Sequence, residues 1–117
     1  MADDTLFGVH GAALEVRAQR MNLLASNIAN ASTPGYKAKD IDFAQALSSA
    51  GDTGEVSGDS LTAATKYRLP TQSSLDGNTV ELTTEQTDFA ENAVAYQTTL
   101  SFLNGRIGQI TRALKGE

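Results

Sequence analysis

The sequence predicts a mainly α-helical fold in which two long terminal helices pair as a coiled-coil-like hairpin. Apolar residues recur at helical spacing near both ends of the chain, whereas the middle has few large apolar residues. We expect one domain over residues 1–117, because domains usually contain about 50 to 250 residues. Its expected parts are a first helix over 4–31, a loop or extended segment over 32–82, and a second helix over 83–115.

The first helix is indicated by apolar residues that recur every seven positions, although His10 and Arg17 interrupt the pattern. Asp3 or Asp4 can cap its start, and the turn sequence Ser32–Gly35, with its proline and glycine, can end it. The apolar positions of this helix seam are Phe7, Leu14, Met21, Leu24 and Ile28.

The second helix has the stronger pattern, because its apolar residues alternate in steps of four and three without a polar interruption. Thr83 and Gln86 have the spacing of a capping box, with Thr83 as the N-cap. The simplest interpretation of both seams is helix core, and we expect them to face each other in an antiparallel pair. The seam residues of this helix are Phe89, Ala93, Tyr96, Leu100, Leu103, Ile107, Ile110 and Leu114.

The middle of the chain has a different composition. Residues 48–66 contain only two large apolar residues, and we interpret them as a loop or adaptable segment without a core of its own. Farther along, Asp76–Gly77 is a strong turn signal between residues 67–70 and 79–82. This arrangement predicts a short β-hairpin or an extended excursion.

The composition predicts a chain that completes its core against other chains. Leu, Ile, Val and Phe together make up 25 of 117 residues, and much of the remaining apolar content is alanine, which buries little area. Such a content is close to the level of about 20% below which chains tend to be disordered. A free-standing monomer would therefore offset its conformational entropy only with difficulty.

Charge and cysteine content exclude several classes of function. A net charge of −5 argues against nucleic-acid binding, which depends on Lys and Arg. No apolar run approaches the 18 or so residues of a membrane span, so we expect no direct lipid binding. The absence of cysteine excludes disulfides, thiolate zinc sites and a Cys nucleophile.

No pattern of residues supports catalysis, a cofactor or a metal. His10 is the only histidine, and no G-x-S-x-G nucleophile motif accompanies it. Residues 76–78 resemble the opening of a calcium loop, but Val80 stands where an oxygen ligand belongs. We therefore expect a protein that is not an enzyme.

A stripe of small residues runs along the second helix, opposite its apolar seam. One interpretation is an ordinary solvated face. Such faces usually carry Lys and Glu, however, and glycine in a helix costs about 1 kcal/mol relative to alanine. We therefore favour a contact face between subunits. The residues of this small face are Thr98, Ser101, Gly105 and Gly108.

Two asparagines stand three residues apart near the end of the first helix. Asparagine weakens a helix, because its side chain competes for backbone hydrogen bonds. We predict that the amides of Asn27 and Asn30 bind neighbouring backbone, either in the turn at residues 33–36 or in an adjacent subunit. They would then fix the angle at which the chain leaves the helix. The alternative is two solvated side chains.

The end of the first helix and the turn after it carry a motif that resembles the N-terminal signature of the flagellar rod, hook and hook-associated axial proteins. Within this family, residues 37–43, 67–70, 74–80 and 100–107 resemble the proximal rod branch. The assembly motif consists of Ala25, Ser26, Asn27, Ile28, Ala29, Asn30, Thr33, Pro34, Gly35 and Tyr36.

The resemblance implies a structural subunit of the basal-body rod. Such a subunit self-assembles through its terminal helices into the tubular shaft that transmits torque and encloses the export channel. The implied partners are other copies of the chain, sister rod proteins, and the FliE adaptor and flagellar export gate at the rod base. The implied location is the periplasm-spanning rod, reached through the flagellar type III apparatus.

Two further expectations accompany this interpretation. Asp3 and Asp4 occupy the region where a secretory signal carries positive charge, so we expect no Sec signal. A helical-hairpin secretion chaperone or adaptor module is the alternative function. A chaperone would be a stable folded dimer by itself, whereas a rod subunit would stay a loosely ordered monomer until it assembles.

Overall fold

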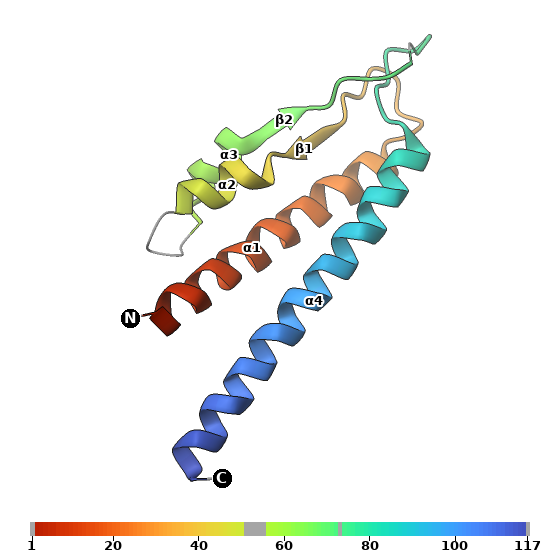
Figure 1. Ribbon diagram of the computed structural model, residues 1–117. Coiled ribbons are helices and arrows are strands. Elements are labelled where there is room, and N and C mark those ends of the chain that lie inside the picture. Colours follow the sequence, from red (N-terminus) through yellow and green to blue (C-terminus); the bar gives the residue numbers. More distant parts are fainter. Residues whose placement is uncertain (1, 51–55, 73, 117) are drawn as a thin grey trace.

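The computed structural model describes residues 2–50, 56–72 and 74–116, with the side chains of the first helix from Gly8 onward. The long terminal helices lie side by side and antiparallel, with a smaller layer packed on the first of them (Figure 1). The elements in chain order are α1 (Ala2–Ala29), β1 (Lys39–Ile41), α2 (Phe43–Ala50), α3 (Gly58–Ala64), β2 (Thr65–Tyr67) and α4 (Leu82–Lys115).

The predicted fold class is confirmed: the chain is mainly helical, and its terminal helices form a hairpin. The molecule is elongated, with principal dimensions of 64 × 25 × 18 Å. Its length comes from α4, which extends past the N-terminal end of α1 (Figure 1). None of the described helices is both long and apolar enough to cross a membrane.

The start of α4 differs from the prediction. Its N-cap is Glu81, and the predicted capping box of Thr83 and Gln86 is wrong. The amide of Glu85 already donates to the carbonyl of Glu81 at 2.9 Å, so Thr83 lies inside the helix. The Glu81 side chain instead accepts hydrogen bonds from the amide and hydroxyl of Thr71. At the other end Gly116 closes the helix with a φ of 76°, which glycine adopts without strain.

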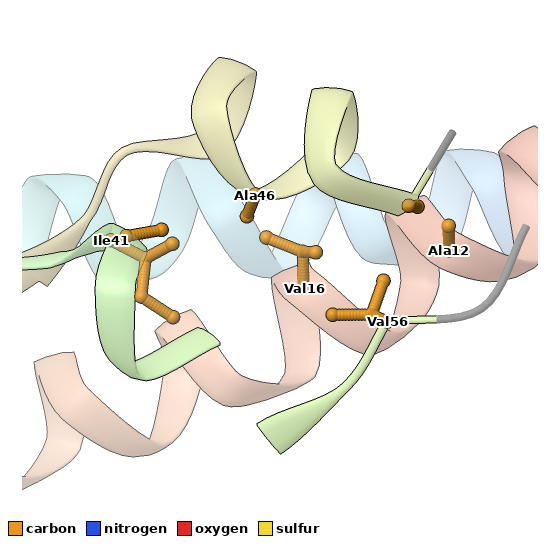
Figure 2. Close-up of a cluster of buried hydrophobic side chains, with 7 residues drawn as sticks. Ala12, Val16, Ile41, Ala46 and Val56 are labelled. Carbon is orange, nitrogen blue, oxygen red and sulfur yellow. The ribbon is translucent and has the colours of Figure 1, made fainter. Parts of the chain in front are cut away.

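The interpretation of residues 48–66 as a loop is wrong for the described part of that range, which excludes residues 51–55. The expectation that this segment has no core of its own is confirmed, because its buried side chains share one core with Ala12 and Val16 of α1. Helix α2 ends within residues 48–66, and α3 and the start of β2 follow. Their alanines bury little area each, but such small side chains allow α2 to pack closely on α1 and α3 to pack closely on α2. Figure 2 shows the resulting core, with Val16 of α1 facing residues of the middle segment. The core residues are Ala12, Val16, Ile41, Ala46, Ala50, Val56 and Ala64.

The two-stranded sheet lies elsewhere than predicted. Strand β1 pairs antiparallel with β2, and Asp40 stands opposite Lys66. Of the two alternatives for residues 67–82, the hairpin is wrong, because residues 79 and 80 have no strand structure and the amide of Thr79 donates to the carbonyl of Tyr36. The described part of residues 68–81 is an excursion without helix or strand, as the other alternative had it. The turn at Asp76–Gly77 is confirmed, with a φ of 78° at Gly77.

Candidate functional site

The assembly motif packs against residues 74–80, and we call this pair of segments the motif joint. Its centre is Asn78, whose buried side-chain amide donates to three carbonyls of the turn just after α1: those of Asn30 at 2.9 Å, Ala31 at 3.0 Å and Thr33 at 2.8 Å. The last carbonyls of α1 itself accept from the backbone amides of Asn30 and Ala31. A side chain more than forty residues away therefore holds the turn that follows α1.

Backbone hydrogen bonds extend this joint. The amide of Gly35 donates to the carbonyl of Asp76 at 2.9 Å, and the amide of Thr79 donates to the carbonyl of Tyr36 at 2.9 Å. The hydroxyl of Thr79 accepts from the amide of Ala38 at 2.8 Å. Two segments that the resemblance singled out separately thus form one structural unit.

Asn27 belongs to the α1 part of the motif joint, and its side chain is fully buried. Its amide nitrogen donates to the carbonyl of Lys39 at 2.8 Å and to Oε2 of Glu85 at 2.9 Å. Its amide oxygen accepts from the Lys39 amide at 3.1 Å and the Tyr36 hydroxyl at 3.3 Å. The amide of Asn27 thus bonds to backbone, but to that of Lys39 and not to that of the turn at residues 33–36, as one of the two predicted alternatives had it.

Asn30 has a more local role. Its amide nitrogen donates to the carbonyl of Ser26 at 2.8 Å, one turn back in the same helix. Its amide oxygen accepts from the hydroxyl of Thr33 at 3.0 Å. The side chain therefore connects the end of α1 to the turn through the Thr33 hydroxyl, and not through the turn backbone as predicted.

Five charged side chains form a cluster between the two long helices and the small sheet. The carboxylate of Asp40 accepts from Arg20 Nε at 2.8 Å and from an Arg68 terminal nitrogen at 2.8 Å. Arg68 also reaches Asp88 at 2.9 Å and, through Nε, Glu85 at 3.1 Å. The members come from α1, β1, the residue after β2, and α4. This charge cluster ties the middle segment to both helices.

Burial sets the electrostatics of the cluster. Desolvation raises the pKa of Glu85, against the opposing effects of the Asn27 hydrogen bond and the nearby Arg68 charge. The hydrogen bond to Asp40 raises the pKa of Arg20, so the guanidinium stays protonated at any physiological pH. Buried ion pairs carry a large desolvation cost, so they specify an arrangement more than they stabilise it.

This charge cluster and the polar residues beside the α4 seam were not predicted from the sequence. Glu85 and Asn92 stand seven residues apart on that helix, and both are buried. Asn92 donates to the carbonyl of Arg17 on α1 at 2.8 Å. The seven-residue spacing was a signal that both face the partner helix. The cationic members Arg20 and Arg68 gave no comparable signal.

The seam residues divide into two groups along the hairpin. Leu24 is buried, and most of the others are partly buried. Near the end of α4, by contrast, Ile107 is 54% and Leu114 is 85% exposed, with Ile110 also exposed. The side chain of Phe7 lies outside the described part of the structure. The partly buried seam residues are Leu14, Met21, Ile28, Phe89, Ala93, Tyr96, Leu100 and Leu103.

The small face lies on the open side of α4. Thr98, Ser101 and Gly105 are exposed, and Gly108 is partly buried. A Cβ atom at Gly105 would meet nothing within 4 Å, and one at Gly108 would contact only the guanidinium of Arg112, at 3.5 Å. Larger side chains therefore fit this face of the single chain.

The described residues contain no group of three or more His, Asp or Glu side chains that could hold a metal ion. His10 packs its ring against Phe102 at a centroid distance of 4.6 Å. This contact places the side chain in the interface between the two long helices.

Comparison with known proteins first gives the class. Residues 7–37, which include the whole assembly motif, match the family of flagella basal body rod proteins. That family is one of structural proteins rather than enzymes.

Curated relatives then give the particular family. The chain is 49% identical to the flagellar basal body rod protein FlgB of Cereibacter sphaeroides, with 94% of each chain covered. It is 44% identical to FlgB of Aeromonas hydrophila, covering 97% of this chain and 96% of the relative. It is 43% identical to FlgB of Escherichia coli strain K12, covering 88% of both chains. The chain therefore belongs to the FlgB family of flagellar basal body rod proteins.

Proposed function

We propose that this protein is a structural subunit of the proximal flagellar rod. It assembles through its terminal helices into the tubular shaft that transmits torque and encloses the export channel. The observation that carries the proposal is the exposed end of α4, residues 107–115, where Ile107, Ile110 and Leu114 are apolar and exposed on one face of the helix. Contiguous apolar surface of this kind is typical of a face that another protein covers.

The motif joint and the small face have different roles in this proposal. The polar groups of the joint already have partners within the chain, so the joint fixes how the middle segment is held against the hairpin. The small face of α4 has room for a neighbouring backbone. The neighbours are copies of this chain and sister rod proteins, with the FliE adaptor and the export gate at the base of the rod.

Export through the flagellar type III apparatus as an unfolded chain is part of the same proposal. A chain without cysteine cannot be trapped by disulfides on the way. Its apolar core consists mainly of alanine and valine, which lowers the free energy needed to unfold it before export. Family membership favours this function over the alternative of a helical-hairpin secretion chaperone or adaptor module.

The test uses cells that lack their own copy of the protein. We expect the wild-type chain to restore motility and to be present in purified basal bodies. The double substitution Ile107→Asn and Ile110→Asn should leave the chain exported but absent from basal bodies, because both side chains are exposed in the single chain. Leu69→Asn, a matched change at an exposed residue outside α4, should assemble normally.

Two outcomes would contradict the proposal. One is a double variant that is incorporated into basal bodies at the wild-type level. The other is a wild-type chain that stays in the cell as a stable dimer bound to an exported protein, which would favour the chaperone.

A further inference from the structure

We infer that the free edge of β2 is a docking site for an extended segment of a partner protein, which pairs with β2 as a third strand. The segment that fits this edge has an acidic residue next to an apolar one. The inference goes beyond the proposed function, because it concerns the middle segment and not the contacts that the terminal helices make.

The pairing of the two strands determines which way their backbone groups point. Lys39 stands opposite Tyr67, and one position farther along, the amide of Arg68 donates to the carbonyl of Ala38 at 2.9 Å. In an antiparallel pair, hydrogen-bonded positions alternate with positions whose amide and carbonyl groups point away from the partner strand. The backbone groups of Lys39 and of Tyr67 therefore point to the two outer edges of the sheet.

The outer edge of β1 is covered by α1. The side-chain amide of Asn27 donates to the carbonyl of Lys39 at 2.8 Å and accepts from the Lys39 amide at 3.1 Å. Asn27 therefore makes the two hydrogen bonds that a further strand would make. Figure 1 shows the resulting order, with β1 between α1 and β2.

The outer edge of β2 has no such cover. Within the part of the chain that the structure describes, no hydrogen bond reaches the amide or the carbonyl of Tyr67. The Tyr67 side chain is 67% exposed, and the amine of Lys39 lies 5.4 Å from the centre of its ring. An unpaired donor and acceptor at the edge of a sheet bind the backbone of another extended segment.

The residues beside this edge favour an acidic side chain in the partner. A strand that pairs with Tyr67 places one of its residues opposite Lys66, and opposite charges attract across neighbouring strands. On the inner side of β2, Asp40 already stands opposite Lys66. Opposite Tyr67 itself, an apolar side chain can cover the exposed ring.

The other charges near the edge leave this preference in place. Lys39 is exposed and makes no ion pair with any residue that the structure describes. Asp42 lies 3.4 Å from the amine of Lys66, whose side chain nevertheless stays 58% exposed. Arg68 is held by the carboxylates of the charge cluster, and Asp59 lies in the first turn of α3, at the end away from β2. The exposed charges at the edge are therefore two lysines and one aspartate.

A second copy of this chain is disfavoured as the occupant. Two β2 edges that pair antiparallel around Tyr67 place Lys66 of each copy opposite Arg68 of the other. A shift of the register by two residues places Lys66 opposite Lys66, or Arg68 opposite Arg68. Like charges directly opposite each other destabilise a strand pair. The edge is also short, because Pro70 has no amide to donate.

NMR spectroscopy of the full-length chain tests the inference. The probe is a synthetic peptide, acetyl-Thr-Asp-Ile-Asp-Thr-amide, whose two aspartates place one acid opposite Lys66 in either strand direction. We expect the peptide to slow hydrogen exchange of the Tyr67 amide several-fold and to shift the signals of Lys66 and Tyr67. The analogue with lysine in place of both aspartates should have little effect.

Two substitutions separate backbone pairing from a side-chain contact. Tyr67→Pro removes only the outward amide, because Tyr67 makes no hydrogen bond to β1, and proline is tolerated on an edge strand. The Lys66 signal of this variant should no longer respond to the acidic peptide. Tyr67→Val keeps the amide and should retain the response. Unchanged signals of Val16 and Ile41 in the core show that each variant is folded.

The inference is overturned if the acidic peptide leaves exchange of the Tyr67 amide unchanged, if the lysine peptide is equally effective, or if a folded Tyr67→Pro responds like Tyr67→Val. Slow exchange of this amide at high protein concentration without peptide would assign the edge to a second copy. Incorporation into basal bodies is measured separately. A chain that is incorporated but does not bind the peptide leaves the proposed function standing and removes only the docking site.

Discussion

The two halves of α4 reverse the usual distribution of polar and apolar side chains. In the first half, the polar residues Glu85 and Asn92 are buried and hydrogen-bonded to α1. In the second half, the apolar residues Ile107, Ile110 and Leu114 are exposed to solvent. A free soluble helix would be expected to do the opposite. The first half therefore fixes a defined geometry within the chain, and the second half leaves apolar surface for neighbours.

The largest expected difference between the two regions concerns their leucines. Leu24→Ala should lower the free energy of unfolding by about 2 to 5 kcal/mol, because it removes a fully buried side chain and leaves a cavity. Leu114→Ala should change it by about 0.5 kcal/mol or less, because that side chain is exposed. Urea unfolding of the single chain measures both. Equal losses for the two variants would show that the end of α4 is already packed in the monomer.

The asparagines of the assembly motif give the next largest contrast. Asn27→Ala should destabilise the chain by about 1 to 3 kcal/mol, because it leaves the buried Glu85 carboxylate and the partly buried backbone groups of Lys39 without this partner. Asn30→Ala should cost about 1 kcal/mol or less, since its bonds are local and more exposed. We also expect Asn27→Ala to impair rod assembly, which incorporation into basal bodies would measure. A larger loss for Asn30→Ala would contradict this assignment of roles.

The long helices could be predicted from the sequence because their signal is local. The steps of three and four that end at Leu114 need no knowledge of the rest of the chain. Their boundaries came within one or two residues of the structure. The N-cap of α4 was misplaced because Glu81, which has no side-chain cap, begins the helix only through its backbone carbonyl.

The core and the motif joint could not be predicted, because they depend on contacts between distant segments. Ala46 and Ala64 are buried where α2 packs on α1 and α3 packs on α2, and an alanine gives no sign of this in the sequence. The partners of Asn78 lie 45 to 48 residues away. The members of the charge cluster are distributed over four segments, so each one alone resembles an ordinary surface charge.

A substitution in the small face should change the stability of the chain only slightly but abolish its function. Gly105→Leu should raise the stability of the isolated helix by about 0.8 kcal/mol, because leucine is the better helix former and the added atoms meet open space. Motility should nevertheless be lost, because a neighbouring subunit would be excluded. Circular dichroism and a motility assay measure the two effects. Motile cells carrying Gly105→Leu would show that this face is merely solvated.

The smallest expected effect tests the buried polar half of α4 through its pH dependence. Below a pH of about 4.5 the Glu85 carboxyl is protonated in both the folded and the unfolded chain. Burial raises its pKa in the folded state, so just above that pH only the folded chain holds the proton. The wild-type chain must therefore lose stability from this group as the pH rises through the folded pKa.

Glu85→Gln removes the titration but keeps an amide oxygen that can accept from Asn27. The free energy of unfolding of this variant, relative to wild type, should therefore increase from about pH 4 to about pH 7.

Other carboxyl groups do not disturb this comparison. Their lowered pKa values contribute to the pH dependence of stability with the opposite sign, but the groups are present in both chains, so the contribution cancels in the difference. These groups are Asp42, Asp76 and Glu81. Glu91→Gln, on the exposed side of α4, is the matched control for the loss of one charge. If the difference in free energy of unfolding between Glu85→Gln and wild type stays constant with pH, water reaches the Glu85 carboxyl. The first half of α4 would then be packed less tightly against α1 than its contacts indicate.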